Sequence, residues 1–354
     1  MILQDKTVLV TGGTGSMGQV FVRRVLAGEL GTPKKVIVLS RDEAKQHEMR
    51  ISYLHRKAST DEVIYRNFTN VLEFRIGDVR NYGDVCSAVR DAQVVVNAAA
   101  LKQVPTCEYF PEQAIMTNCL GPANIARAIR EHGYPVEVVC GISTDKAVEP
   151  INVMGMTKAI QERIFISSNV LSTGARYVCV RYGNVLASRG SVIPLFHDQI
   201  RTGGPVTITD PEMTRFLLTL NQAIDTVFAA LRDAKRGETF IPRVPAANIV
   251  HIAKVLIGTR RIDMKTTGIR PGEKVHEILI SEAEARRCVR RGDFHAIQPM
   301  LPELADPHAQ LETLSKEYSS ADDVMTFDQT RALLEKNGLL IEQGAQLDNG
   351  ELLR

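Results

Sequence analysis

One glycine-rich stretch, TGGTGSMG at residues 11–18, constrains the fold of this chain more than any other feature. It directly follows an apolar run and opens a segment, 16–28, whose apolar residues recur with helical spacing. Between a strand and a helix, Gly12 permits a tight turn, Gly15 lets backbone N–H groups approach a pyrophosphate, and Gly18 allows close helix packing. The N-terminus of that helix then faces the anion. We therefore predict that a dinucleotide binds near the start of this chain.

Strand-like and helix-like segments alternate through the first half of the chain. The strand candidates are nearly continuous apolar runs, which is typical of a parallel sheet covered by helices on both faces. Right-handed crossovers then make the sheet doubly wound. We predict an α/β protein with a Rossmann-like, doubly wound parallel sheet and a smaller, mixed α/β substrate-binding region. The strand candidates lie at 7–13, 34–40, 72–79, 92–100, 136–143 and 176–184, and helix candidates lie at 16–28, 81–91, 112–132 and 154–170.

The pattern changes after Asn184, where turns rich in glycine and proline become frequent. This change indicates a second region whose pieces close over the carboxyl ends of the strands. We expect a cofactor-binding Rossmann domain over 1–185, with a segment near 206–250 that returns to it. The substrate-binding region and the C-terminal tail then comprise 186–205 and 251–354.

Several helix boundaries can be predicted from local residues. Ser40 and Glu43 match a capping box ahead of a helix. The residues near 215–232 have the pattern of a helix that returns to the first domain. In the tail, Thr326 is a suitable cap for one further helix, and Gly338 is a suitable stop for it.

Composition excludes several classes of function. The chain has 354 residues and a net charge of +2, which predicts no general affinity for nucleic acid or acidic membranes. Its six cysteines form no CxxC pair and no cluster with zinc-ligand spacing, so we expect no metal site and reduced, buried thiols. The N-terminus lacks a signal-peptide pattern, and the longest apolar run, 94–101, is too short to span a bilayer. We expect a cytoplasmic protein.

The end of the second strand distinguishes the two nicotinamide cofactors. An acidic residue there would bond the ribose 2′-hydroxyl of NAD, whereas an arginine accommodates the 2′-phosphate of NADP. This chain has Ser40 and Arg41 at that place and Lys45 one helical turn later. The pattern favours NADP and leaves NAD possible. In the alternative interpretation, Ser40 only caps a helix and Arg41 pairs with Asp42 or Glu43.

The third and fourth strands also end in residues suited to the cofactor. Asp78 follows the third strand and can accept a bond from the adenine amino group. Small residues in NAAALKQVP, 97–105, would let a nicotinamide riboside lie against the backbone. The expected cofactor-binding residues are Gly12, Thr14, Gly15, Ser16, Met17, Gly18, Ser40, Arg41, Lys45, Asp78, Val79, Ala98, Ala99, Ala100 and Lys158.

A further polar stretch, STDK at 143–146, follows the fifth strand. Ligands bind beyond the carboxyl ends of the strands in this architecture. Met154 and Lys158 lie one turn apart on the next helix, so both can face the same site. On spacing alone, Asp145 and Lys146 fit an exposed ion pair better than a catalytic pair.

Taken together, these motifs carry a resemblance to a known family. TGxxGxxG, Asp78, NAAALK, STDKA, an MxxxK helix and RPGEK occur in the order typical of extended short-chain dehydrogenases/reductases. Within that group, SRDEAKQ, STDKAVEPINVMGMTK, VRYGNVLASRGSVIPLF, MTRFLL and RPGEKVHEIL are similar to nucleotide-sugar 4,6-dehydratases that act on UDP-N-acetylglucosamine. The resemblance covers roughly residues 5 to 285. It implies a homo-oligomer, a UDP-sugar substrate and a role in bacterial surface-glycan or amino-sugar biosynthesis.

Met154 departs from the pattern of the wider superfamily, which has a tyrosine there to take a proton from the sugar hydroxyl. A thioether can act as neither acid nor base. Some members of the dehydratase group also carry a methionine at this place. We expect Met154 to pack in the core and another residue to transfer the proton.

The resemblance assigns the chemistry to four residues. In the implied reaction, C4 of the sugar is oxidised, water is eliminated across C5 and C6, and hydride returns to C6. Thr144 would bond the 4-hydroxyl, and Lys158 would bond the nicotinamide ribose. Asp145, with a pKa raised by burial, would be the acid, and Lys146, with a lowered pKa, would be the base. Asp145 as carboxylate, or a water relay, would accept the C4 hydroxyl proton.

The resemblance also suggests residues that hold the UDP-sugar. Arg215 and Arg270 are candidates for the diphosphate, because a guanidinium matches phosphate oxygens. Glu273 would hold the uridine ribose, and Lys102 would reach the sugar. Asn184 and the loop ASRGSVIP would contact the nucleotide. The alternatives are a C5-inverting version of the reaction, a UDP-sugar 4-epimerase, and a non-catalytic sensor that binds a dinucleotide.

Overall fold

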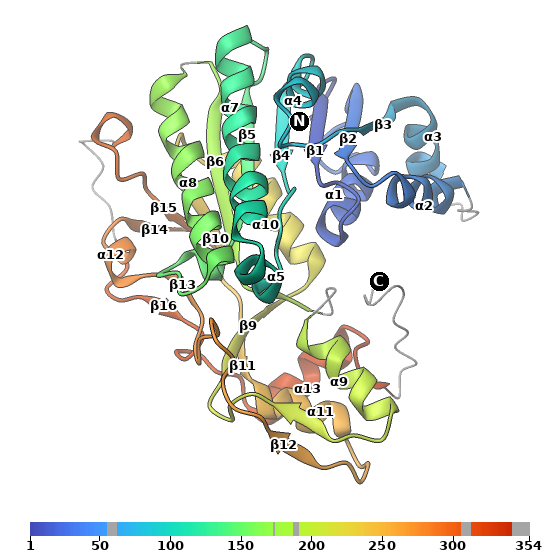
Figure 1. Cartoon of the computed structure of the whole chain (residues 1–354), viewed down its shortest axis with the longest axis vertical. Coiled ribbons are helices and arrows are strands. Elements are labelled where there is room, and N and C mark those ends of the chain that lie inside the picture. The colour runs from blue at the N-terminus through green and yellow to red at the C-terminus, as the bar shows by residue number, and fades with distance from the viewer. Residues whose placement is uncertain (55–61, 173, 187–190, 306–312, 342–354) are drawn as a thin grey trace.

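The structure is a computed structural model that describes residues 1–54, 62–172, 174–186, 191–305 and 313–341. Figure 1 shows a large lobe, in which helices cover both faces of a central sheet, and a smaller lobe built mainly from the later part of the chain. The loop ASRGSVIP expected to contact the nucleotide falls partly on 187–190, outside the described residues.

The central sheet has nine strands in the order β14-β15-β10-β6-β5-β4-β1-β2-β3. The seven strands from β10 to β3 in this order are parallel, whereas β15 pairs antiparallel with both β10 and β14. The chain order reverses between β1 and β4, which creates the crevice where α/β proteins bind ligands. The predicted Rossmann-like fold class is confirmed. The strands are β1 (Thr7–Thr11), β2 (Lys35–Ser40), β3 (Leu72–Ile76), β4 (Val94–Asn97), β5 (Val138–Thr144), β6 (Arg176–Tyr182), β10 (Thr239–Pro242), β14 (Cys288–Arg291) and β15 (Phe294–Ile297).

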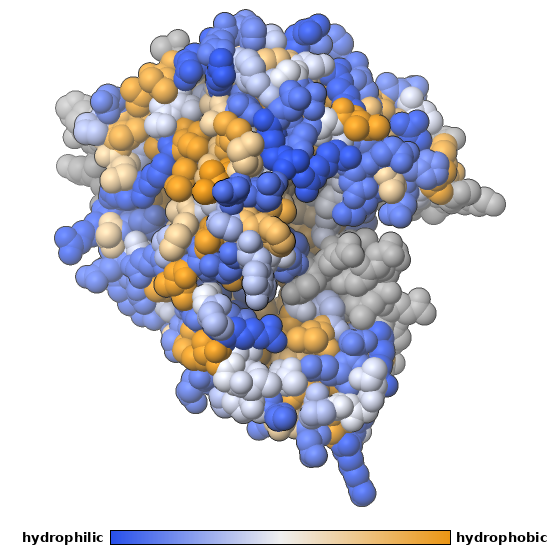
Figure 2. All heavy atoms as spheres, in the orientation of Figure 1, coloured by the Kyte–Doolittle hydropathy of each residue, from blue (hydrophilic) through white to orange (hydrophobic). Residues whose placement is uncertain are grey.

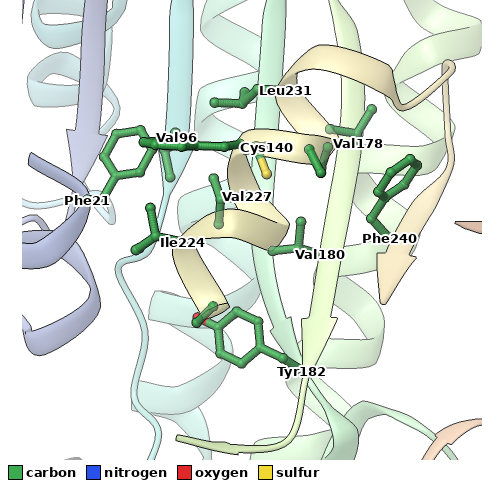
Figure 3. Packing of buried hydrophobic residues seen from close by; sticks show 14 of the residues in the cluster. Phe21, Val96, Cys140, Val178, Val180, Tyr182, Ile224, Val227, Leu231 and Phe240 are labelled. Atoms are coloured by element: carbon green, nitrogen blue, oxygen red, sulfur yellow. The ribbon is translucent and has the colours of Figure 1, made fainter. Parts of the chain in front are cut away.

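Helices pack on both faces of this sheet because its strands are apolar on both sides. One face carries α1 (Ser16–Leu26), α2 (Glu43–Leu54), α3 (Glu62–Val71) and α10 (Leu220–Asp233), and the other carries α4 (Tyr82–Val89), α7 (Gly121–His132) and α8 (Val153–Leu171). Figure 3 shows Ile224, Val227 and Leu231 of α10 packed against the sheet residues Val96 and Cys140. The return of the chain expected near 215–232 is therefore made by α10.

The smaller lobe has its own apolar core, which includes Phe196, Ile252 and Leu334. The segment that returns to the large lobe is shorter than the expected 206–250. Within it, β10 is a strand of the large sheet and α10 packs against that sheet, whereas β8, β9 and β11 belong to the smaller lobe. The hairpin β14–β15, expected in the substrate region, also joins that sheet. The lobe comprises β7 (Asn184–Val185), α9 (Val192–Arg201), β8 (Val206–Ile208), β9 (Thr214–Leu218), β11 (Ala246–Asn248), α11 (Ile249–Ile257), β12 (Met264–Thr266) and α13 (Phe327–Lys336).

Two of the predicted helix boundaries can be compared with the structure. The cap of α13 is confirmed, since Thr326 forms a capping box and Gly338 has a positive φ of 62°. The capping box predicted at Ser40 is wrong. Asp42 Oδ1 accepts the Lys45 N–H at 3.1 Å and caps α2 instead, while the Ser40 hydroxyl lies 3.0 Å from that of Thr14.

The segment 277–285 packs against the core of the large lobe, where Leu279, Ile280 and Ala285 are buried. Arg181 of β6 is buried and forms ion pairs with Glu162 of α8 and Glu284 of α12. Glu277 immediately precedes β13, which pairs antiparallel with β16. The remaining elements are α5 (Val104–Tyr109), α6 (Pro111–Ile115), η2 (Met116–Leu120), η3 (Asp145–Ala147), β13 (Ile278–Ile280), α12 (Glu282–Ala285), η4 (Pro302–Leu304) and β16 (Tyr318–Ser319).

Three general features bear on function. Within the described residues, no helix combines the length and apolar character needed to cross a bilayer. The surface in Figure 2 mixes hydrophilic and hydrophobic residues over both lobes. All six cysteines are free thiols, and five of them are buried.

Candidate active site

A cavity of about 1090 Å³ opens at the carboxyl ends of β1, β2, β4, β5 and β6. Its position is the crevice at which the strand order reverses. All fifteen residues expected to bind the cofactor line this cavity. Thr144, Asp145, Lys146, Met154, Lys102 and Asn184 line it as well. The structure therefore brings together the residues that the sequence assigned to cofactor and to chemistry.

The β1–α1 turn is built for the close approach of a phosphate. Gly12 has a φ of +66°, and a Cβ there would lie 2.7 Å from the Ala99 nitrogen. A Cβ on Gly18 would lie 2.5 Å from the Gly13 Cα, so the helix could not pack as it does. Helix α1 starts after Gly15, whose lack of a side chain leaves the first-turn N–H groups without a side-chain cap among the described residues. These features fit a pyrophosphate at this helix N-terminus.

Basic side chains gather at the end of β2. The Arg41 guanidinium is mostly exposed and lies 3.8 Å from the Asp78 carboxylate, rather than beside Asp42 or Glu43. Lys45 pairs with Asp42 at 3.3 Å. Burial acts to raise the pKa of Asp78, but hydrogen bonds from Arg80 outweigh it and lower that pKa. Asp78 is therefore ionised and could accept a hydrogen bond from an adenine amino group, while Arg80 donates to the same carboxylate.

Asp145 is the most deeply buried polar group of the site, with 1% of its surface exposed. Its Oδ1 accepts hydrogen bonds from the Thr144 hydroxyl at 2.7 Å and from the Lys146 backbone and side-chain nitrogens at 2.9 and 3.2 Å. Its Oδ2 is buried and has no hydrogen-bond partner among the described residues. Burial raises the pKa of Asp145 despite the opposing Lys146 cation, as the resemblance implied, and the exposed ion pair that spacing alone favoured is wrong.

The predicted pKa of Lys146 is wrong in direction. Burial acts to lower that pKa, but two carboxylates, of Asp145 and Glu277, outweigh burial and raise it above the ordinary value. The Lys146 Nζ lies 2.9 Å from Glu277 Oε1 and 3.2 Å from Asp145 Oδ1. Lys146 is therefore an ammonium group in this arrangement.

Lys158 has the lowered pKa that was expected of Lys146. Its side chain is 6% exposed, and burial lowers its pKa to about 8. The Nζ of Lys158 donates to Gln161 Oε1 at 2.6 Å, and Gln161 in turn donates to the Ile142 carbonyl of β5. This chain of bonds holds the Lys158 amine beside the end of β5.

Met154 packs as expected, in a small apolar cluster with Cys107 and Ala114. The next residue explains how η3 and α8 fit together. A Cβ on Gly155 would lie 2.1 Å from the Lys146 carbonyl oxygen, so only glycine allows this approach. Because of this close approach, Met154 and Lys158 of α8 line the same cavity as Asp145 and Lys146.

Three of the residues expected to bind substrate lie away from this cavity. The Arg215 guanidinium donates to the carbonyls of Thr214, Lys274 and Val275. Arg270 is exposed to solvent, and Glu273 is half-buried with one carboxylate oxygen that has no partner in the described part of the chain. Among the described residues, no group of three or more His, Cys, Asp or Glu side chains is arranged to hold a metal ion.

Glu277 was missed in the sequence. The stretch RPGEKVHEIL contains two glutamates, and the first, Glu273, was the one selected. Its position in the sequence was the available signal. Glu277 directly precedes the apolar run ILI, which forms the largely buried strand β13, so its own side chain could be expected to be buried as well.

Comparisons with known proteins give the family. The family described as "Polysaccharide biosynthesis protein" matches residues 8–299. A curated relative from Rickettsia rickettsii, named UDP-glucose 4-epimerase, is 43% identical over 298 residues, which is 83% of each chain. The crystal structure of Pen from Bacillus thuringiensis is 33% identical with a TM-score of 0.84, covering 96% of this chain and all of Pen. DesIV, a dTDP-glucose 4,6-dehydratase from Streptomyces venezuelae solved with NAD, shares the fold at 20% identity and a TM-score of 0.63, over 76% of this chain and 86% of its own.

Proposed function

The chain belongs to the polysaccharide biosynthesis protein family of extended short-chain dehydrogenases/reductases. Within this family we propose, from the residues of its site, that it is a UDP-N-acetylglucosamine 4,6-dehydratase. The product would be a UDP-2-acetamido-2,6-dideoxy-4-keto-hexose. One observation carries the proposal: a buried carboxyl, Asp145, touches Lys146 in the cofactor cavity. Elimination across C5 and C6 needs an acid and a base on adjacent carbons, whereas 4-epimerisation needs neither there.

The cofactor end of the site fits a nicotinamide dinucleotide, and NADP is the form that Ser40, Arg41 and Lys45 favour. When bound, this group would take a hydride from sugar C4 and return it to C6. Gly12, Gly15 and the N-terminus of α1 would hold its pyrophosphate.

Asp145 would take the proton of the C4 hydroxyl, in place of the tyrosine that Met154 replaces. Because its pKa is raised, the Asp145 carboxylate is a stronger base than an ordinary aspartate. The Thr144 hydroxyl donates to the same carboxylate and can orient the C4 hydroxyl toward it. After this step Asp145 is a neutral acid, with its proton available for the next one.

Elimination then uses the same carboxyl with Lys146. The 4-keto group acidifies the C5 proton, which the Lys146 amine would take, and Asp145 would give its proton to the C6 oxygen so that water leaves. Protonation of Asp145 removes one of the two negative charges that hold the proton of Lys146. The pKa of Lys146 therefore falls at the stage at which the amine must be neutral.

Two polar side chains of the cavity are placed to recognise the UDP-sugar. Lys102 and Asn184 line the cavity beyond the cofactor residues and would face the sugar and the nucleotide. Arg215, Arg270 and Glu273 would need substrate-linked movement to reach the diphosphate and the ribose. The substrate that we propose is a UDP-sugar. We also propose that the protein acts in the cytoplasm and as a homo-oligomer.

A UDP-sugar 4-epimerase is the second candidate, because the Rickettsia relative carries that name at 43% identity. Proton NMR of the purified protein with UDP-N-acetylglucosamine and NADP in heavy water separates the two. We expect loss of the C6 hydroxymethyl signals, a new C6 methyl signal and deuterium at C5. Formation of the C4 epimer without a methyl signal would contradict the dehydratase proposal. Cofactor binding without turnover of any UDP-sugar would indicate a sensor.

A further inference from the structure

Glu277 contributes a second buried carboxylate to the site from a distant part of the chain. Its side chain is 3% exposed, and its Oε1 accepts from Lys146 Nζ at 2.9 Å. The Ser320 hydroxyl accepts its backbone N–H at 2.9 Å, and the Ser320 N–H donates to its carbonyl. Its Oε2 is buried and has no hydrogen-bond partner among the described residues. A fixed carboxylate with a vacant acceptor atom therefore faces the amine that the elimination requires.

The elimination creates a need for such a group. An ammonium nitrogen has no lone pair and cannot take the C5 proton, so Lys146 must first lose one. Asp145 cannot store that proton, because in the proposed reaction it already carries the proton destined for the C6 oxygen. Glu277 is the other carboxylate within hydrogen-bond distance of Lys146 Nζ.

We propose that Glu277 is a positioning residue that accepts a proton from Lys146 and so makes it the base for C5, an inference that rests on the proposed dehydratase function. An N–H bond of Lys146 breaks and an O–H bond forms on Glu277. The neutral Lys146 then takes the C5 proton. After hydride has returned to C6, Lys146 gives C5 one of the three equivalent hydrogens on its ammonium nitrogen, which in heavy water include deuterium, and recovers a proton from Glu277. No proton is gained or lost overall.

The neighbouring charges return the proton from Glu277 to Lys146 when the reaction is complete. The charged groups that face the pair are Asp145 in η3, Arg215 of β9, whose Nε lies 3.9 Å from Glu277 Oε1, and Lys274. Both cations favour the ionised carboxylate, so Glu277 is a carboxylate at rest. Inside a buried site, however, a neutral acid–amine pair avoids the cost of keeping two desolvated charges. Once Asp145 is neutral, the two forms of the pair differ less in free energy.

The test is the pH dependence of dehydration by Glu277→Gln. In the native protein the proton moves internally, so the elimination rate should change little across neutral pH. In Glu277→Gln the proton of Lys146 must go to solvent. Removing the Glu277 charge lowers the pKa of Lys146, but a buried lysine such as Lys158, with a pKa of about 8, is still mostly protonated at neutral pH. We therefore expect a loss of about tenfold at neutral pH, which is recovered as pH rises by about one unit. Glu282→Gln, an exposed glutamate of the same segment, is the matched control and should behave like the native protein.

A second variant keeps the test decisive if Glu277→Gln folds poorly. Glu277→Asp retains a carboxylate, so it should lose rate but keep the flat pH profile of the native protein. Thermal unfolding and NADP binding report whether each variant is folded. A Glu277→Gln loss that is equal at every pH, no loss at all, or a steep pH profile in Glu277→Asp would each overturn the inference. Failure of the dehydratase proposal is seen separately, as absence of the dehydrated product from the native protein.

Discussion

Replacing Asp145 with asparagine separates the two proton transfers proposed for the site. Asparagine keeps an oxygen for the three hydrogen bonds that Asp145 Oδ1 accepts, but it cannot take the C4 hydroxyl proton or donate to C6. Loss of a positioned acid–base group typically lowers rate by about 100- to 10,000-fold. We expect dehydration by Asp145→Asn to fall within that range. Because the amide resembles the neutral carboxyl, Lys146 should still act as a base.

The fold should survive this change. The new amide N–H₂ replaces Oδ2, which has no partner among the described residues, and an unsatisfied buried donor costs about 1–3 kcal/mol. A second effect of the substitution is stabilising. Burial raises the pKa of Asp145, so in the native protein the ionised carboxyl destabilises the folded state once pH exceeds the ordinary pKa of an aspartate. Asparagine removes that cost. The free energy of unfolding should therefore change by less than about 3 kcal/mol.

The assay compares two reactions of one variant in heavy water. Dehydration of UDP-N-acetylglucosamine needs Asp145, whereas deuterium exchange at C5 of the finished 4-keto product needs only the base. We expect Asp145→Asn to lose dehydration and keep C5 exchange, and Lys146→Met to lose both. Full dehydratase activity in Asp145→Asn would refute the role of Asp145. Equal loss of exchange in the two variants would refute the division of labour between acid and base.

Three further changes test other parts of the site. Burial lowers the pKa of Lys158 from 10.5 to about 8, so the free energy of unfolding should rise by about 3 kcal/mol between pH 8 and pH 10.5. Lys158→Met should abolish this rise in denaturant unfolding curves recorded at several pH values. Gly155→Ala would push a Cβ into the Lys146 carbonyl and should lower dehydration about 100-fold, whereas Gly174→Ala, whose added Cβ has no described neighbour within 4 Å, should not. Arg41→Ala should weaken NADP binding about tenfold or more and leave NAD binding nearly unchanged in titrations of both cofactors.

The large sheet could be predicted because each of its parallel strands is a local apolar run. The six strands expected from 7 to 184 all form, and the glycine motif lies at the first strand–helix turn. The later part of the chain was harder because its placement depends on distant partners. The short strand β9 pairs with β7 and β11, and the hairpin β14–β15 extends the large sheet beside β10. No local pattern in these residues distinguishes the two lobes.

The same limit explains the error in the charge of Lys146. The sequence identified Asp145 and Lys146 as neighbours, and their spacing alone fitted an exposed ion pair, so the burial of Asp145 was expected only from the family resemblance. The protonation of Lys146 depends on Glu277, which is 131 residues away in the chain. An isolated buried lysine would indeed have a lowered pKa, as Lys158 does. Only the three-dimensional structure shows which of the two lysines has carboxylates beside it.

Methionine at position 154 is compatible with catalysis if one carboxyl serves two steps. A tyrosine on α8 would take only the C4 hydroxyl proton, and a separate acid would still be needed for the C6 oxygen. Asp145 lies in η3, where contact between Gly155 and the Lys146 carbonyl fixes the backbone. In the proposed reaction, its raised pKa would let it accept the first proton and deliver it at the second step. Methionine at 154 and the burial of Asp145 would then be linked, since a carboxyl with an ordinary pKa would release the proton before elimination.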